Sequence, residues 1–110
     1  MSPILVAWLL LAASILSEVV GTVALKHSNG FANLLPTTCA AASFLIAIWL
    51  MSLSLKHIEM GITYAVWAGS ATAILAMVGI ALYGESLSVF KMVGMVMVVG
   101  GVIVLNLDTH

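Results

Sequence analysis

The sequence predicts an all-α membrane protein with four transmembrane helices. Only seven of its 110 residues are charged, while 64% are hydrophobic and the mean hydropathy is +1.28. An ordinary soluble domain is about a quarter charged. A chain this short cannot cover so much apolar surface with its own polar residues, so its exterior is expected to face lipid or a partner. The net charge of −1 also argues against electrostatic binding of nucleic acid.

The charged residues divide the chain into four long uncharged stretches, at residues 1–17, 27–55, 60–84 and 92–107. A helix needs roughly 20 apolar residues to cross a bilayer, so four spans use about 80 residues and leave little more than turns. We therefore expect one transmembrane domain over residues 1–110, with helices at about 3–26, 33–55, 62–82 and 87–107.

Turn-forming residues separate these helices. Pro3 suits the first turn of the first helix, and residues 1–25 hold no Lys or Arg, so this segment is expected to be retained rather than cleaved. The turns are marked by Asn29-Gly30, by residues 56–61 and by Gly84-Glu85-Ser86. Because the second loop is very short, the second and third helices are expected to pack as an antiparallel hairpin.

The lysines give almost no orientation bias. Lys26 and Lys91 fall on one side of the predicted bundle, and Lys56 lies on the other side with the amino terminus. Two interpretations remain open from charge alone. The chain inserts in both orientations, which would permit an antiparallel homodimer, or one lysine is enough to orient it.

Small residues mark a packing face on the fourth helix. Gly94, Val98 and Gly101 lie on one side of it, so another helix can approach closely there. The partner is either another helix of this chain or a second copy. We favour dimerisation through this helix.

Glu18 is the one charged residue deep inside a predicted span, where an unpaired carboxylate costs several kcal/mol. At about 100° per residue, its stripe is expected to form a cavity wall of Ala7, Leu11, Ser14, Gly21, Thr22 and Leu25. A cation bound at Glu18 would expel the proton of the carboxyl group, and this competition is the minimal chemistry of a proton-coupled exporter. The alternative is a neutral Glu18 that is hydrogen-bonded to a neighbour on its own helix.

Aromatic side chains are candidates for binding organic cations. Tyr64 and Trp67 are three residues apart and share a face of the third helix, although Tyr64 also suits an interfacial anchor. For Trp8 and Phe44, cavity lining, lipid contact and interfacial anchoring remain equally open.

The middle of the third helix carries the small residues Gly69, Ser70 and Ala71. They allow a kink that would act as a hinge for alternating access, and close helix packing would explain them as well. His27, His57 and His110 are too scattered for a metal site. With no cofactor motif or nucleophile–base pair, we expect no cofactor, no metal and no enzyme activity.

The chain as a whole resembles the small multidrug resistance family of four-helix proton-coupled exporters. The matching segments, in order, are residues 17–22 (SEVVGT), Lys26, residues 29–31 (NGF), Leu35-Pro36, residues 61–69 (GITYAVWAG) and residues 94–101. The resemblance implies an antiparallel, dual-topology homodimer in the bacterial inner membrane, in which both copies of Glu18 form one site for protons or substrate. It further implies that Tyr64 and Trp67 line this site, that Ser14, Gly21 and Thr22 flank the carboxylate, and that residues 69–71 kink the third helix.

The family divides into exporters of quaternary ammonium and other lipophilic cations and exporters of guanidinium-type metabolites. The second branch typically has Trp where this chain has Gly21, so the chain is more similar to the first branch. Phe44 and Trp8 stand where drug exporters commonly have Tyr. Export of lipophilic cations is therefore the first hypothesis, and export of guanidinium compounds and a non-transporting membrane partner subunit are the alternatives.

Overall fold

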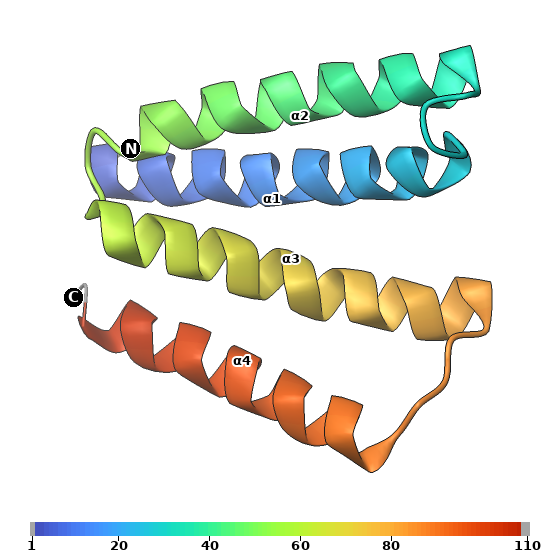
Figure 1. Cartoon of the computed structure of the whole chain (residues 1–110). Coiled ribbons are helices and arrows are strands. Elements are labelled where there is room, and N and C mark those ends of the chain that lie inside the picture. Colours follow the sequence, from blue (N-terminus) through green and yellow to red (C-terminus); the bar gives the residue numbers. More distant parts are fainter. Residues whose placement is uncertain (1, 109–110) are drawn as a thin grey trace.

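The computed structural model describes residues 2–108, and these form four helices joined by short loops (Figure 1). The helices are α1 (Pro3–His27), α2 (Leu34–Ser54), α3 (Met60–Tyr83) and α4 (Val89–Asp108). All four are long and apolar enough to cross a membrane, as the sequence predicts. Their bounds lie within two residues of the expected ones. Met1, Thr109 and His110 lie outside the described residues.

Local polar contacts determine where α1 begins and ends. The Ser2 hydroxyl accepts a hydrogen bond of 3.1 Å from the backbone N–H of Leu5, and Pro3 occupies the first turn. At the other end, the Ser28 hydroxyl donates to the carbonyl of Leu25 at 2.7 Å. Residues 29–31 then adopt left-handed backbone conformations, with φ angles of 51°, 67° and 70°. The chain reverses at this point and enters α2.

Small residues spaced seven apart let α1 and α2 pack closely. These buried residues are Ala7, Ser14 and Gly21 on α1 and Ala40, Ala47 and Ser54 on α2. Two hydroxyls cross the interface: Ser14 donates to the carbonyl of Ala47 at 2.6 Å, and Ser54 donates to that of Ala7 at 3.0 Å. Close backbone approach with hydroxyl hydrogen bonds is a common way for helices to associate in lipid.

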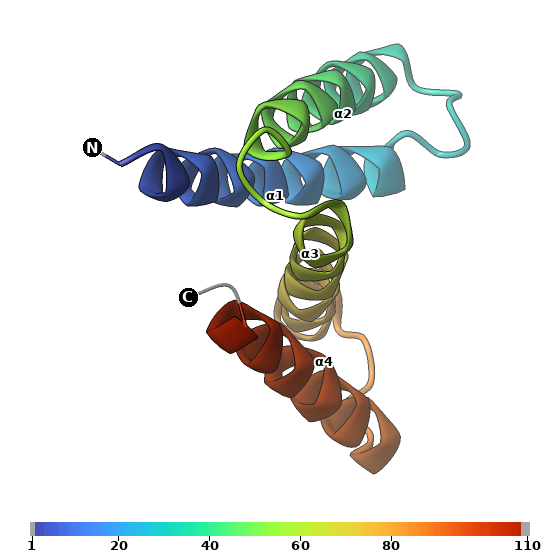
Figure 2. The same cartoon turned by 90° about the vertical axis from the view of Figure 1, so that its left-hand side faces the viewer.

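The expected hairpin of the second and third helices is wrong. Although a short loop joins α2 to α3, α1 lies between them, and α4 packs on the far side of α3 (Figures 1 and 2). The reason is that α1 presents small residues to α2 and larger ones to α3. Its Leu11 and Ile15 form the buried core with Ile62 and Val66 of α3.

The helix ends divide between two faces of the bundle. Successive helices run in opposite directions, so the carboxyl ends of α1 and α3 and the start of α4 lie at the same end of the bundle (Figure 1). Lys26 and Lys91 belong to this end, and Lys56 belongs to the opposite loop. This division is the one expected from the sequence.

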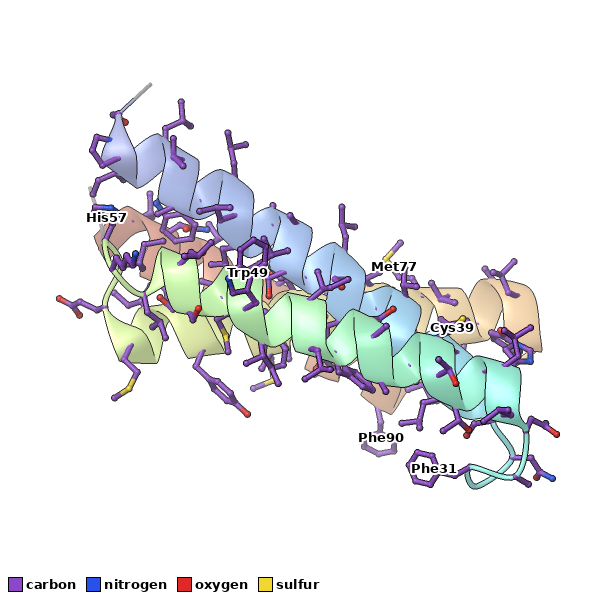
Figure 3. The ribbon with its side chains drawn as sticks, turned by 90° about the horizontal axis from the view of Figure 1, so that it is seen from above. Phe31, Cys39, Trp49, His57, Met77 and Phe90 are labelled. Atoms are coloured by element: carbon purple, nitrogen blue, oxygen red, sulfur yellow. The ribbon has the colours of Figure 1, made fainter. Side chains whose placement is uncertain are left out.

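The outer surface of the bundle is apolar. Among the described residues α4 has no buried side chain, and Phe90 on its first turn is 90% exposed and projects away from the ribbon (Figure 3). Met77 and Trp49 are also mostly exposed. Such a surface suits contact with lipid or with a second membrane protein.

Candidate functional site

Glu18 lies near the middle of α1, nine residues before its end at His27. At about 1.5 Å per residue, this places the carboxylate about 14 Å from the helix end, close to half the thickness of a bilayer core. Its Oε1 accepts a hydrogen bond of 2.9 Å from the hydroxyl of Thr22, one turn further along. Its Oε2 is buried and has no hydrogen-bond partner among the described residues. One carboxylate oxygen is therefore held by a hydrogen bond, and the other is buried without a partner among the described residues.

A polar chain of three residues lies one turn before Glu18. The Trp67 indole N–H of α3 donates to the hydroxyl of Ser14 at 3.0 Å, and that hydroxyl donates to the carbonyl of Ala47 on α2 at 2.6 Å. Ser14 is fully buried. Through this residue the structure joins the aromatic face of α3 to the helix that carries the carboxylate.

Tyr64 and Trp67 share one face of α3, as predicted. Their ring centroids are 5.7 Å apart and the ring planes are tilted by 40°. Tyr64 is 59% exposed, so its ring faces outward from the single chain. Trp8, one of the less specific candidates, is half-buried against the core around Leu11 and is separated from Glu18 by almost three helical turns.

The stripe expected to form a cavity wall is used in part for packing. Ala7, Ser14 and Gly21 are buried against α2, and Leu11 belongs to the core. A Cβ added at Gly21 would lie 3.1 Å from the Phe44 ring and from the Ser43 side chain, a tighter contact than most Cβ atoms make. The smallest residues of a membrane helix favour contact with another helix, which accounts for this packing. Of this stripe, Thr22 lines a cavity at the end of the bundle.

One residue of the expected hinge, Gly69, packs against one residue of the expected dimer face, Val98. The α3 helix is continuous through residues 69–71, and a Cβ added at Gly69 would lie 2.8 Å from Val102 and 3.3 Å from Val98 of α4. Close packing therefore accounts for Gly69, and Val98 faces α3 of its own chain. Nothing else in the described chain lies within 4 Å of a Cβ added at Gly94 or Gly101. The hinge and the dimer contact remain predictions.

Sequence reasoning missed a cluster at the carboxyl ends of α1 and α3. Lys26 Nζ lies 3.9 Å from Glu85 Oε2 and 5.0 Å from the centre of the Tyr83 ring, and His27 Nε2 is hydrogen-bonded to the Tyr83 hydroxyl at 2.7 Å. Beside them is a cavity of about 300 Å³ that extends to Thr22. The order of the spans could have indicated this cluster. Because one span lies between α1 and α3 in the sequence, the two helices end on the same side of the membrane.

The fold and this site define a multi-pass membrane protein with a half-buried acidic residue near the middle of one span. Residues 6–98 match the sequence model of the family described as Small Multidrug Resistance protein. The chain belongs to this family, as the sequence resemblance indicated, and is a multi-pass bacterial membrane protein.

Named relatives match the chain over most of its length. The quaternary ammonium compound-resistance protein QacF of Klebsiella aerogenes is 43% identical over 100 residues, which are 91% of each chain. The multidrug resistance protein EbrB of Bacillus atrophaeus is 44% identical over 89% of this chain and 84% of its own. The nicotine metabolites export pump subunit NepA of Paenarthrobacter nicotinovorans is 40% identical over 94% of this chain and 90% of its own.

Proposed function

We propose that this protein exports lipophilic and quaternary ammonium cations in exchange for protons, with Glu18 as the group that both ligands share. The observation that carries the proposal is the Glu18 carboxylate, which is held by Thr22 through Oε1 while the buried Oε2 has no partner among the described residues. The names of QacF and EbrB, resistance proteins for quaternary ammonium compounds and multiple drugs, support this substrate class.

The aromatic residues supply the second half of the proposed chemistry. A cation close to Trp67 would gain about 0.5–2 kcal/mol from the ring, and Ser14 holds the indole of Trp67 one turn from the carboxylate. A negative charge beside an aromatic face recognises a lipophilic cation without requiring one exact shape. The arrangement therefore suits a broad set of organic cations.

In this proposal the working unit is an antiparallel homodimer in which two Glu18 carboxylates face one shared site. The exposed Tyr64 would contribute to that site, and Gly94 and Gly101 would meet the second copy. A substrate cation would bind when the carboxylates are ionised and leave when they are protonated on the other side of the membrane. The near-zero lysine bias is consistent with insertion in both orientations.

The test is substrate-driven current from the purified protein in liposomes. Benzyltrimethylammonium and guanidinium are applied separately to the wild type, to Glu18→Gln and to Glu59→Gln, which changes an exposed carboxylate at a helix end. Current with benzyltrimethylammonium that is lost in Glu18→Gln and kept in Glu59→Gln is expected. Current with guanidinium alone would assign the chain to the guanidinium-exporting branch, and coupled current in Glu18→Gln would refute the proposed role of Glu18.

A second candidate is one subunit of a two-chain pump. The name of NepA, which is 40% identical to this chain, describes a pump subunit. On this reading the folded protein gives no current with either cation when it is reconstituted alone. Current from the chain by itself would exclude the second candidate.

A further inference from the structure

The ammonium group of Lys26 occupies a small site made by two residues at the end of α3. Glu85 Oε2 lies 3.9 Å from Lys26 Nζ, and the Tyr83 ring centre lies 5.0 Å from the same atom. A carboxylate and an aromatic face are the two groups that bind organic ammonium ions in proteins. The chain therefore holds one of its own cations in a site with the chemistry of a cation receptor.

Local structure fixes both receptor groups. His27 is hydrogen-bonded to the Tyr83 hydroxyl at 2.7 Å, which ties the ring to the end of α1. The Glu85 carboxylate lies directly over Gly79, where a Cβ on that residue would overlap it. The Glu85 N–H also donates to the Gly79 carbonyl at 3.1 Å after the left-handed Gly84, which has a φ of 65°. Glu85 is thus positioned by the end of the helix, although its side chain is about half exposed.

The adjoining cavity has room for the apolar body of such a ligand. It measures about 300 Å³, and its lining combines Lys26, Tyr83 and Glu85 with apolar residues of both helices, namely Val23, Leu75, Ala76 and Val78. Its inner end is Thr22, whose hydroxyl donates to Glu18 Oε1. The cavity therefore leads from the end of the bundle to the residue that holds the central carboxylate.

From this arrangement we infer that Glu85 and Tyr83 form an outer binding site for lipophilic organic cations, which an incoming cation enters by displacing the ammonium group of Lys26. The inference rests on the proposed function for the nature of the substrate. It adds a second, weaker site on the route to Glu18. Lys26 acts there as a built-in competitor that keeps the receptor groups together while no substrate is bound.

The experiment measures binding of benzyltrimethylammonium by titration calorimetry to the full chain in lipid nanodiscs. All variants carry Glu18→Gln, so that the central site does not contribute. Glu85→Gln and Lys26→Met are compared with Glu59→Gln and Lys56→Met, which make the same charge changes at the opposite end of the bundle. Tyr83→Phe retains the ring and removes the hydroxyl that contacts His27.

The two main variants are expected to act in opposite directions. Glu85→Gln should weaken the remaining binding at least about fivefold, because it removes the charge that attracts the cation. Lys26→Met should strengthen binding roughly twofold to fivefold, because an exposed pair of this kind holds the site only weakly against a competitor. A gain in affinity cannot come from misfolding. Tyr83→Phe and both opposite-end controls should change binding less than about twofold.

Absence of binding in Glu18→Gln protein would overturn the inference, as would a Lys26→Met variant that binds no more tightly than Lys56→Met. Failure of the proposed function gives a different result. In that case liposomes with the wild-type protein show no current that depends on Glu18, whatever the Glu85→Gln and Lys26→Met variants do to cation binding.

Discussion

The indole N–H of Trp67 donates a 3.0 Å hydrogen bond to the hydroxyl of Ser14, which in turn donates to the backbone of α2. A single buried hydroxyl therefore connects three helices at the level of the candidate site. Ser14 uses both its donor and its acceptor capacity, so neither neighbouring helix can shift without breaking a hydrogen bond.

This relationship predicts coupling between the two side chains. Ser14→Ala and Trp67→Phe should each lower the free energy of unfolding, and the double variant should lose less than the sum. The expected coupling energy is about 0.6 kcal/mol and no more than about 1.7 kcal/mol, the mean and the maximum found for hydrogen bonds between membrane helices. Steric trapping in bicelles measures it. Ser52→Ala serves as the control because that hydroxyl bonds only within its own helix, to the carbonyl of Trp49. Strict additivity of the two changes would show that the bond contributes nothing.

Gly21 is predicted to tolerate no side chain while Phe44 is present. In Gly21→Ala the new Cβ would meet the Phe44 ring and Ser43 at 3.1 Å, so these side chains must shift by a few tenths of an ångström. We expect a loss of about 1–3 kcal/mol in unfolding free energy, and partial recovery when Phe44→Leu is added. The measurement is again steric trapping.

The matched control for Gly21 is Gly61→Ala on α3. Beyond its own helix, no described residue lies within 4 Å of a Cβ at this position. Alanine there should be neutral or stabilising by up to about 1 kcal/mol, because glycine is a poor helix former. Equal effects at the two positions would mean that contact with Phe44 is not the cause.

Thr22 is predicted to support cation binding through Glu18. Thr22→Val keeps the shape of the side chain and removes the hydroxyl that donates to Oε1 at 2.9 Å. The carboxylate then loses its only hydrogen bond in the described chain, and binding of benzyltrimethylammonium at fixed pH should weaken roughly threefold to tenfold.

Two further variants make this test specific. Thr22→Ser retains the hydroxyl and should bind like the wild type, whereas Thr38→Val removes a hydroxyl that bonds only to the carbonyl of Leu34 in its own helix. Calorimetry on protein in nanodiscs gives the affinities. If Thr22→Val binds the cation as tightly as the wild type, the Thr22 hydroxyl does not support cation binding by Glu18.

The number of helices could be predicted from the sequence, but their neighbours could not. Lipid requires long uncharged stretches, and the few charged residues mark where these end. The sequence indicates less clearly which spans pack together, because each helix is apolar on every side. The seven-residue spacing of Ala7, Ser14 and Gly21 predicts a face for close helix packing, but it does not indicate that α2 is the helix that packs there.

The candidate site shows the same limit. Glu18 stood out because a charge inside a span is rare, and Trp67 because aromatic residues suit cations. The cluster of Lys26 with Tyr83 and Glu85 could not be predicted from the sequence, because each of these residues is common at the end of a membrane helix. Only the arrangement of α1 beside α3 brings these side chains together.

The face of α4 that carries Gly101 is predicted to contact a second copy of the chain. Nothing else among the described residues lies within 4 Å of a Cβ added at Gly101, so Gly101→Leu should leave the four-helix chain folded. It should nevertheless weaken dimerisation about tenfold, because a large side chain prevents close approach of two helices. Energy transfer between labelled copies, measured as the protein is diluted in liposomes, reports the dimer. Gly100→Leu is the matched control, because this neighbour is equally free within the chain but points about 100° away around the helix. If the two variants dimerise equally well, the second copy binds elsewhere.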